Sequence, residues 1–481
     1  MLGQISADSL RGHLSFIASD LLEGRASPSR GLDLAAEYIA SQFRRAGLEP
    51  AGDDGYYQTA DLVEIQPVKE SYEMRIDQGG QSISIPRDEI TPQFYTALEI
   101  PRTGVYKLDA GNEAAVSALK PEDVHDKVLV TEVPDFSGDE SSRALRKFNA
   151  ALQALERAKP KLTVMLVSQA VPEFTTSLVF SERRESGKGP KIMVTSPAAL
   201  KWFASLAPGD SDATFTLHLP ASAESKIKLH NVIGLLRGSD PALKDTYILV
   251  TAHYDHLGMK PNGAGDRVYN GANDDGSGTV SVIELASALA TSQPRPKRSI
   301  VFMTFFGEEE GDFGSRYYAR HPVFPIDKTI ANVNLEQVGR TDSTQGPKIS
   351  EGFFTGYEYS NLPLVFRKAG VLTGLKVLSD KSTGGAFFDR SDNAALAAVG
   401  VPAHTFVVAF EFPDYHAVSD EWQKINYDNM AKVDRMLALG LIMLADSPQA
   451  PKWNQANPKT EPYVTAWKEH HEKASASNSK R

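Results

Sequence analysis

From about residue 230 onward, continuous apolar runs of strand length alternate with segments whose apolar residues recur at helical spacing. A strand that is apolar along its whole length is typical of a parallel sheet buried on both faces. The pattern predicts an α/β fold of three layers, in which helices cover both sides of a mixed, largely parallel central sheet. The strands are expected in TYILVTAHY, RSIVFMTFF, IANVNLE and VPAHTFVVA, and the helices in GSGTVSVIELASALAT and KVDRMLALGLIMLAD.

The beginning of the chain also has helical spacing. Residues 6–48 predict two amphipathic helices, the second running from about Leu32 to Ala46 and ending at Gly47. The segment LLEGRASPSRG between the two helices is rich in turn-forming residues and predicts a loop. We assign residues 1–94 to the same domain as the strands and helices that begin near residue 226.

A separate mixed α/β insert is predicted over residues 95–225. Its short β runs are KVLVTEV, LTVMLVS and KIMVTS, and the helical run ALRKFNAALQALERA lies between the first two. The main domain then continues over residues 226–446. Residues 447–481 are polar and rich in proline and lysine, which predicts a mobile tail.

Composition limits the partners of this chain. With 481 residues and a net charge of −10, we expect two or three soluble domains and neither nucleic acid nor an anionic membrane as partner. No run of residues is long and apolar enough to predict a membrane-spanning helix. The first residues have no apolar signal core, which leaves two alternatives, a cytoplasmic protein or one whose signal has been removed. Of these two we expect the secreted or periplasmic protein.

Candidate metal ligands occur in five short polar words, four of them at or just beyond predicted strand ends. Because the chain has no cysteine, any metal must be held by nitrogen and oxygen, which suits zinc, manganese or cobalt. Open α/β sheets place their sites at the carboxyl ends of strands. The five residues are His253 in TAHYDHLG, Asp274 in YNGANDDGSG, Glu309 in FFGEEEGDFGS, Glu336 in NVNLEQVGR and His416 in PDYHAVSD.

Each word also has a plain structural interpretation. The GANDDGSG word also fits a turn that caps a helix, a role compatible with metal binding, and the three acids of GEEEG fit a solvated helix start equally well. Glu336 also fits an ion pair to Arg340, and His416 an ordinary loop histidine. The joint occurrence of all five words in this order, rather than any one of them, indicates a metal site.

Two further residues fit supporting roles in such a site. Asp255 lies two positions after His253, where a carboxylate can accept the other N–H of the imidazole and fix its tautomer. Of the adjacent acids in GEEEG, one can bind a metal while its neighbour moves a proton.

With these motifs the sequence resembles peptidase family M28, the zinc metallopeptidases related to aminopeptidase Y and aminopeptidase S. The resemblance covers about residues 6–445 and extends to DYHAVSDEWQKINY and to the two N-terminal helices. It implies the zinc-peptidase fold, with the 95–225 insert resembling a protease-associated domain. Peptide is then the expected substrate, and the expected cofactors are two Zn²⁺ per chain, with Mn²⁺ or Co²⁺ as possible substitutes.

The resemblance also implies a role for each site residue. Asp274 would bridge both ions, His253 and Glu336 would complete one zinc, and Glu309 and His416 would complete the other. Glu308 would be the general base and general acid for a metal-activated hydroxide, and Asp255 would orient His253. Tyr415 matches a tyrosine that helps to stabilise the oxyanion in some relatives. The peptide bond between Asp274 and Asp275 is expected to be cis.

Two positions depart from the family pattern. Glu336 stands where aspartate is frequent, and a glutamate still ligates although it is one methylene longer. Asn393 occupies the last place of RSDN, where many bacterial members have histidine. The second departure concerns the expected substrate pocket rather than the metal ligands.

The expected activity is that of an aminopeptidase, which releases N-terminal residues from peptides. Three alternatives remain on the same fold: a glutaminyl cyclase-like acyltransferase with one zinc, a carboxypeptidase acting on acidic dipeptides, and a receptor-like module without catalysis. The oligomeric state is not determined by the sequence.

Overall fold

A computed structural model of the chain divides into two compact units, which are described separately. It describes residues 1–68, 70–134, 141–168, 177–182, 189–344, 346–379 and 385–478. The first unit combines Met1–Ala60 with Lys228–Arg481, and the second is Asp61–Ile227. The larger unit is therefore built from two parts of the chain that are far apart in sequence.

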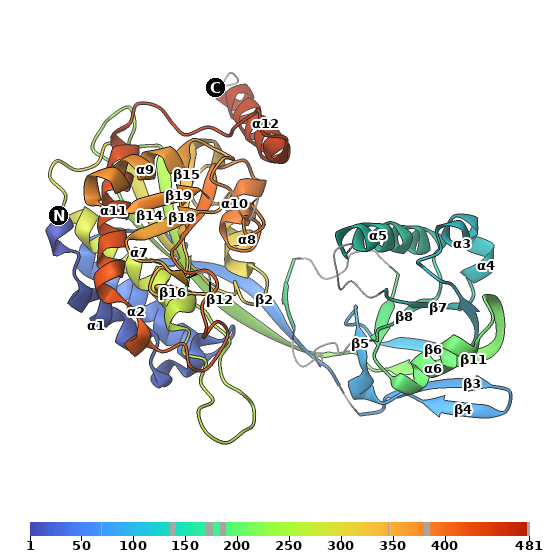
Figure 1. The fold of residues 1–481 in the computed structure, drawn as a ribbon. Helices are drawn as coiled ribbons and strands as arrows, with labels where there is room; N and C mark the ends of the chain where they lie inside the picture. The colour runs from blue at the N-terminus through green and yellow to red at the C-terminus, as the bar shows by residue number, and fades with distance from the viewer. Residues whose placement is uncertain are drawn as a thin grey trace. The chain divides into compact units, whose positions relative to one another are not determined.

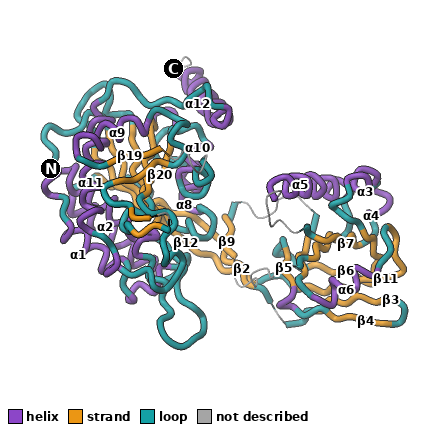
Figure 2. Tube along the Cα trace, in the orientation of Figure 1, coloured by secondary structure: helices purple, strands orange, loops and turns teal. Residues whose placement is uncertain are grey.

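The centre of the larger unit is a mixed sheet (Figures 1 and 2). Four neighbouring strands in the order β14-β13-β15-β20 are parallel to one another. Antiparallel pairs join β12 to β14 and β18 to β20 on either side of them. The strands are β2 (Tyr57–Gln66), β12 (Ala223–Leu236), β13 (Tyr247–His253), β14 (Ser299–Phe305), β15 (Thr329–Leu335), β18 (Glu351–Phe354), β19 (Lys376–Ser379) and β20 (Ala403–Val407).

Helices cover both faces of this sheet, which confirms the predicted three layers (Figure 1). One layer contains α1 (Ala7–Ile17), α2 (Arg30–Ala46), α7 (Gly278–Ala290), α9 (Leu362–Thr373) and α11 (Tyr427–Asp446). The other contains α8 (Phe313–Arg320), α10 (Asn393–Ala398) and α12 (Glu461–Asn478). Every residue of β14 is buried, as its largely apolar sequence predicts.

The two N-terminal helices form where their apolar spacing and capping residues predict them. The Ser6 side chain accepts a hydrogen bond from the backbone N–H of Ser9 and so caps α1. Helix α2 ends at Gly47, whose φ of 75° is in the left-handed region that favours glycine. Both helices pack against α7, so the start of the chain is part of the layer that covers the central sheet.

The second unit contains a sheet of eight strands with helices on both faces (Figure 2). Along β7, Val128 and Val130 face a core that includes Phe203 of α6, whereas Leu129 faces a core that includes Leu155 of α5. The elements are β3 (Glu73–Gln78), β4 (Gln81–Ser84), β5 (Ile90–Pro92), β6 (Leu98–Lys107), α3 (Glu113–Ala118), α4 (Pro121–Val124), β7 (Val128–Glu132), α5 (Ser141–Ala158), β8 (Leu162–Leu166), β10 (Lys191–Val194), α6 (Pro197–Ser205) and β11 (Gly209–Leu219).

The start of this insert differs from the predicted boundary at residue 95. The unit begins at Asp61, because residues 73–92 supply β3, β4 and β5 to its sheet rather than to the sheet of the larger unit. The alternation of polar and apolar residues in this stretch does not tell which of the two sheets a strand joins.

The C-terminal segment also differs from the prediction of a mobile tail. The indole N–H of Trp453 donates to the carbonyl oxygen of Gly400 at 2.8 Å, and the Trp453 ring stacks on Tyr463. These aromatic side chains lie within a polar, proline-rich stretch. The average composition of that stretch therefore did not predict that part of it is packed. Within the part of the chain that the structure describes, no helix combines the length and the apolarity needed to cross a bilayer.

Candidate metal centre

All five predicted ligands belong to the larger unit, and the parallel strands determine where three of them lie. His253 is the last residue of β13, Glu309 follows β14 after a short turn, and Glu336 directly follows β15. Because these strands are parallel neighbours, their carboxyl ends lie at one edge of the sheet. The sheet itself therefore brings together residues that are up to 83 positions apart in the sequence.

The fourth ligand, Asp274, lies in a short helical turn, Ala272–Ser277, that leads into α7. The Asp274–Asp275 peptide bond is cis, as the resemblance implied. One carboxylate oxygen of Asp420 accepts the backbone N–H groups of Asn273 at 2.9 Å and of Asp274 at 3.1 Å. Asp420 thus anchors the loop that presents Asp274.

The two carboxylate oxygens of Asp274 face two different histidines. Oδ1 lies 3.5 Å from Nε2 of His253, and Oδ2 lies 3.2 Å from Nε2 of His416. Two ligands of one tetrahedral zinc ion, each about 2.0–2.1 Å from the ion, are about 3.3 Å apart. The spacing therefore fits one ion between Asp274 and His253 and a second ion between Asp274 and His416.

Glu309 and Glu336 lie on opposite sides of this arrangement. Oε2 of Glu309 is 3.3 Å from Nε2 of His416, so it joins the side that contains His416. Ligand atoms of Glu336 and His253 form one compact group together with Glu308. The structure thus brings all five predicted residues together, with His253 on one side of the Asp274 carboxylate and His416 on the other.

Asp255 supports the first half of the centre. Its Oδ1 lies 3.5 Å from Nδ1 of His253, on the side of the ring opposite Asp274. The same carboxylate accepts the backbone N–H of Glu308 at 3.1 Å and of Glu309 at 3.3 Å. Asp255 therefore links the orientation of His253 to the position of the GEEEG turn.

Electrostatics favour a cation at this place. Burial raises the pKa of Glu336 to about 7 and raises the pKa of Glu308 well above its ordinary value. Interaction with the nearby carboxylates of Asp274 and Glu309 raises the pKa of His416 to about 10. In the absence of a metal, the site therefore favours protonated side chains that bound cations would replace.

The donor set also fits a metal because some of its buried polar atoms make no hydrogen bond with the described residues. Among the described residues, Nε2 of His253, Oδ2 of Asp274 and Oε2 of Glu336 are buried without a hydrogen-bond partner. Buried polar atoms of this kind are costly unless something binds them. Two imidazoles and three carboxylates are nitrogen and oxygen ligands that zinc accepts.

Glu308 differs from its neighbour Glu309 in its surroundings. Oε2 of Glu308 is 3.9 Å from Nε2 of His253, so its carboxylate borders the same space as the ligands. Its side chain is 14% exposed, compared with 8% for Glu309, which contacts two histidines. A carboxylate beside the ligands with access to solvent can exchange protons with a bound water.

Two other predicted positions lie in different environments. The ring of Tyr415 stacks on His416 with 3.9 Å between the ring centroids and remains partly exposed. Asn393 is buried; its amide nitrogen donates to the carbonyl oxygen of Phe388, and its amide oxygen accepts from the Thr405 hydroxyl. The side chain of Asn393 therefore takes part in a buried hydrogen-bond network.

The structure adds one residue that the motifs did not single out, His256. Nδ1 of the buried His256 is 2.7 Å from Oε1 of Glu309, and its ring is edge-on to that of His416. His256 forms a second compact group of possible ligands with Asp274 and Glu309. The signal was present in the word HYDH, but the spacing within a loop does not predict which way a second histidine points.

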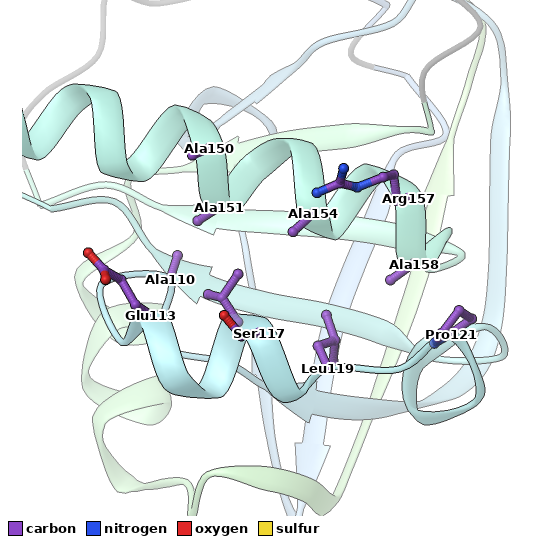
Figure 3. A pocket seen from close by; sticks show the side chains of 11 residues that line it. Ala110, Glu113, Ser117, Leu119, Pro121, Ala150, Ala151, Ala154, Arg157 and Ala158 are labelled. Atoms are coloured by element: carbon purple, nitrogen blue, oxygen red, sulfur yellow. The ribbon is translucent and has the colours of Figure 1, made fainter.

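A cavity of about 500 Å³ lies in the other unit, between α5 and the α3–α4 segment (Figure 3). It is lined mainly by alanine side chains, with Glu113 and Arg157 as its charged residues. This lining offers a single carboxylate and no histidine, so it does not provide the donor set of a metal centre.

The sequence of the larger unit matches a known family. Residues 231–440 match the sequence profile of peptidase family M28. Aminopeptidase Y of Saccharomyces cerevisiae is 27% identical over 241 residues, which are 46% of this chain and 40% of that protein. A vacuolar membrane protease of Phaeosphaeria nodorum is 31% identical over 145 residues, covering 27% of this chain and 14% of the relative. The chain thus spans less than half the length of these curated relatives.

Solved structures share the fold. An aminopeptidase from Aneurinibacillus sp. strain AM-1 superimposes with a TM-score of 0.59 and 17% identity, covering 94% of this chain and 96% of that one. BSAP, a zinc aminopeptidase from Bacillus subtilis, gives a TM-score of 0.50 with 18% identity over 91% of this chain and 95% of that one. These similarities extend over both units and establish the α/β zinc-peptidase fold.

Proposed function

We propose, on the premise that this chain belongs to peptidase family M28, that it is an aminopeptidase that depends on two zinc ions. The observation that carries the proposal is the carboxylate of Asp274, whose two oxygens face His253 and His416 separately. A carboxylate shared in this way is the ligand that two adjacent ions require.

The donor set divides naturally between two ions. His253 and Glu336 would hold one zinc, His416 and Glu309 would hold the other, and Asp274 would contact both. When bound, zinc lowers the pKa of a water and polarises a peptide carbonyl. Manganese or cobalt could replace zinc, because the ligands are nitrogen and oxygen only.

Glu308 would move the proton in this reaction. Its carboxylate borders the ligands without contacting a second histidine, and burial raises its pKa. As a base it would take the proton of the attacking water, and as an acid it would return that proton to the leaving amine. We propose that Tyr415, beside His416 and partly exposed, helps to stabilise the oxyanion.

The remaining proposals concern the insert and the location of the protein. We propose that the Asp61–Ile227 unit is a protease-associated-like domain, because it is a compact α/β unit inserted within the chain of the catalytic one. A secreted or periplasmic location remains our proposal, and fractionation of the native host would test it.

A substrate screen tests the proposed activity directly. Purified protein with zinc, manganese or cobalt is expected to release the N-terminal residue from peptides and aminoacyl p-nitroanilides. Matched substrates whose α-amino group is acetylated should be cleaved much more slowly. Cleavage of free and acetylated substrates at equal rates, or release of C-terminal residues only, would contradict an aminopeptidase.

His256 provides a test of the second half of the centre. His256→Ala removes the group next to Glu309 and is expected to weaken zinc binding by roughly 10- to 100-fold, the usual effect of losing a partner of a metal ligand. His256→Asn keeps a donor near the position of Nδ1 and should lose less. Zinc titration with a competing chelator measures both variants, and equal affinity of His256→Ala and wild type would reduce His256 to a packing residue.

A further inference from the structure

Arg25, in the turn between the two N-terminal helices, is buried with 0% of its surface exposed. Its guanidinium donates only to backbone carbonyl oxygens. Nε donates to Tyr254 at 2.8 Å, and one terminal nitrogen donates to Ile17 at 2.6 Å and to Asn270 at 2.7 Å. The other terminal nitrogen donates to Gly271 at 3.1 Å.

Three of these four carbonyls, those of Tyr254, Asn270 and Gly271, belong to the two loops that carry candidate metal ligands. Tyr254 directly follows the ligand His253, and Gly271 directly precedes the turn that contains Asp274. One rigid, planar group thus connects the end of β13 with the start of the Ala272–Ser277 turn.

The backbone around Arg25 docks against the same region. The carbonyl oxygen of Gly24 accepts the N–H of Gly258 at 3.0 Å, and that of Arg25 accepts the N–H of His256 at 3.2 Å. Gly24 has a φ of 70°, and a Cβ there would lie 2.2 Å from the carbonyl oxygen of Gly258. The approach is therefore close enough to require glycine at this position.

The charge of Arg25 also suits this place. Burial lowers the pKa of Arg25 to about 10, while Asp255 and Asp420 act in the opposite direction, so the group stays positive at neutral pH. A fixed positive charge close to several buried carboxylates offsets part of the repulsion between them.

We propose that Arg25 is a positioning residue for the metal centre, which holds the loop of His253 and the loop of Asp274 at the separation that the two ions need. The proposal rests on the proposed zinc centre and extends it to the N-terminal segment, which lies outside the 231–440 family match.

The test compares Arg25 with a second buried arginine. Arg298 also binds backbone carbonyls, those of Ser447 and Pro448, but it lies at the start of β14, at the end of that strand opposite the GEEEG turn. Zinc affinity is measured by chelator competition, zinc content by elemental analysis, and thermal stability for the metal-free and zinc-loaded forms of each variant.

Arg25→Met is expected to bind zinc roughly 10- to 100-fold more weakly than wild type, the range found for partners of metal ligands. Arg298→Met should lower thermal stability and keep the wild-type zinc affinity. Added guanidinium at millimolar concentration should restore part of the zinc affinity of Arg25→Ala, because it can occupy the vacated place. If Arg25→Met does not fold, Arg25→Lys is used instead. Lysine keeps the positive charge but lacks the planar guanidinium that donates to several carbonyls, so the same loss of zinc affinity is expected.

Wild-type zinc affinity in the folded Arg25 variant would overturn the proposal. Equal loss of zinc affinity in the Arg25 and Arg298 variants would also overturn it, because the effect would then follow from general destabilisation. Wild-type protein that binds no zinc would refute the metal centre itself, which separates the failure of the proposed function from the failure of this inference.

Discussion

Glu308→Gln is expected to lower the turnover of every substrate by roughly 100- to 10,000-fold while the zinc content stays unchanged. Glutamine has nearly the shape of glutamate but cannot take a proton from the attacking water. The Glu308 side chain borders the ligands. The contacts of Glu309 with His256 and His416 do not involve Glu308. Steady-state kinetics together with elemental analysis of the same preparation measures both quantities.

Glu310→Gln is the matched control for this experiment. Glu310 is the third acid of the same turn and is exposed. We expect its amide variant to keep near wild-type turnover and both ions. Glu308→Gln with near wild-type rates on all cleaved substrates would show that another group moves the proton.

Asp274→Ala is expected to remove zinc from both halves of the centre together. The oxygens of Asp274 lie 3.5 and 3.2 Å from two different histidines, so no other side chain can replace both contacts. Affinity for both ions should fall by more than about 100-fold, beyond the range for partners of ligands. Wild-type protein should contain about two ions per chain, since the centre offers ligands for two.

Single-sided variants provide the comparison for Asp274→Ala. Glu336→Gln and His416→Ala should each weaken one ion more than the other. Asp275→Asn should keep both ions, because Oδ1 of Asp275 accepts the backbone N–H groups of Gly278 and Gln337 and an asparagine oxygen can accept both. Loss of only one ion from Asp274→Ala, or a wild-type content near one, would contradict a shared carboxylate and favour a one-zinc, cyclase-like centre.

Much of the catalytic unit could be predicted from the sequence because its strands are buried on both faces. After its first two residues the run RSIVFMTFF is apolar except for Thr304, and β14 is buried along its whole length. The positions of the predicted ligands follow from a related argument. An acid or histidine that directly follows a buried parallel strand, as Glu336 follows β15, lies at the carboxyl edge of the sheet.

The contacts that the sequence could not predict are those between distant loops. Asp420 follows His416 by four positions in the sequence, but that it accepts the N–H groups of Asn273 and Asp274 depends on how two loops approach in space. His256 is similar, since its contact with Glu309 depends on a rotamer and on burial rather than on spacing. Local periodicity carries no information on such contacts.

The burial of Arg25 could not be predicted from the sequence for a different reason. Arg25 lies in a segment of turn-forming residues, where an arginine is ordinarily solvated. Its complete burial follows from the positive φ at Gly24 and from backbone carbonyls supplied by residues 254, 270 and 271. Neither feature is visible in the composition of the turn.

The discontinuous larger unit has a consequence for synthesis on the ribosome. Arg25 and Tyr254 are separated by 229 positions, and the whole Asp61–Ile227 unit is translated between them. Since α1 and α2 pack on α7, their apolar faces remain uncovered until residues 278–290 have emerged. The inserted unit can complete its own sheet during that interval, before the helix on which α1 and α2 pack has been translated.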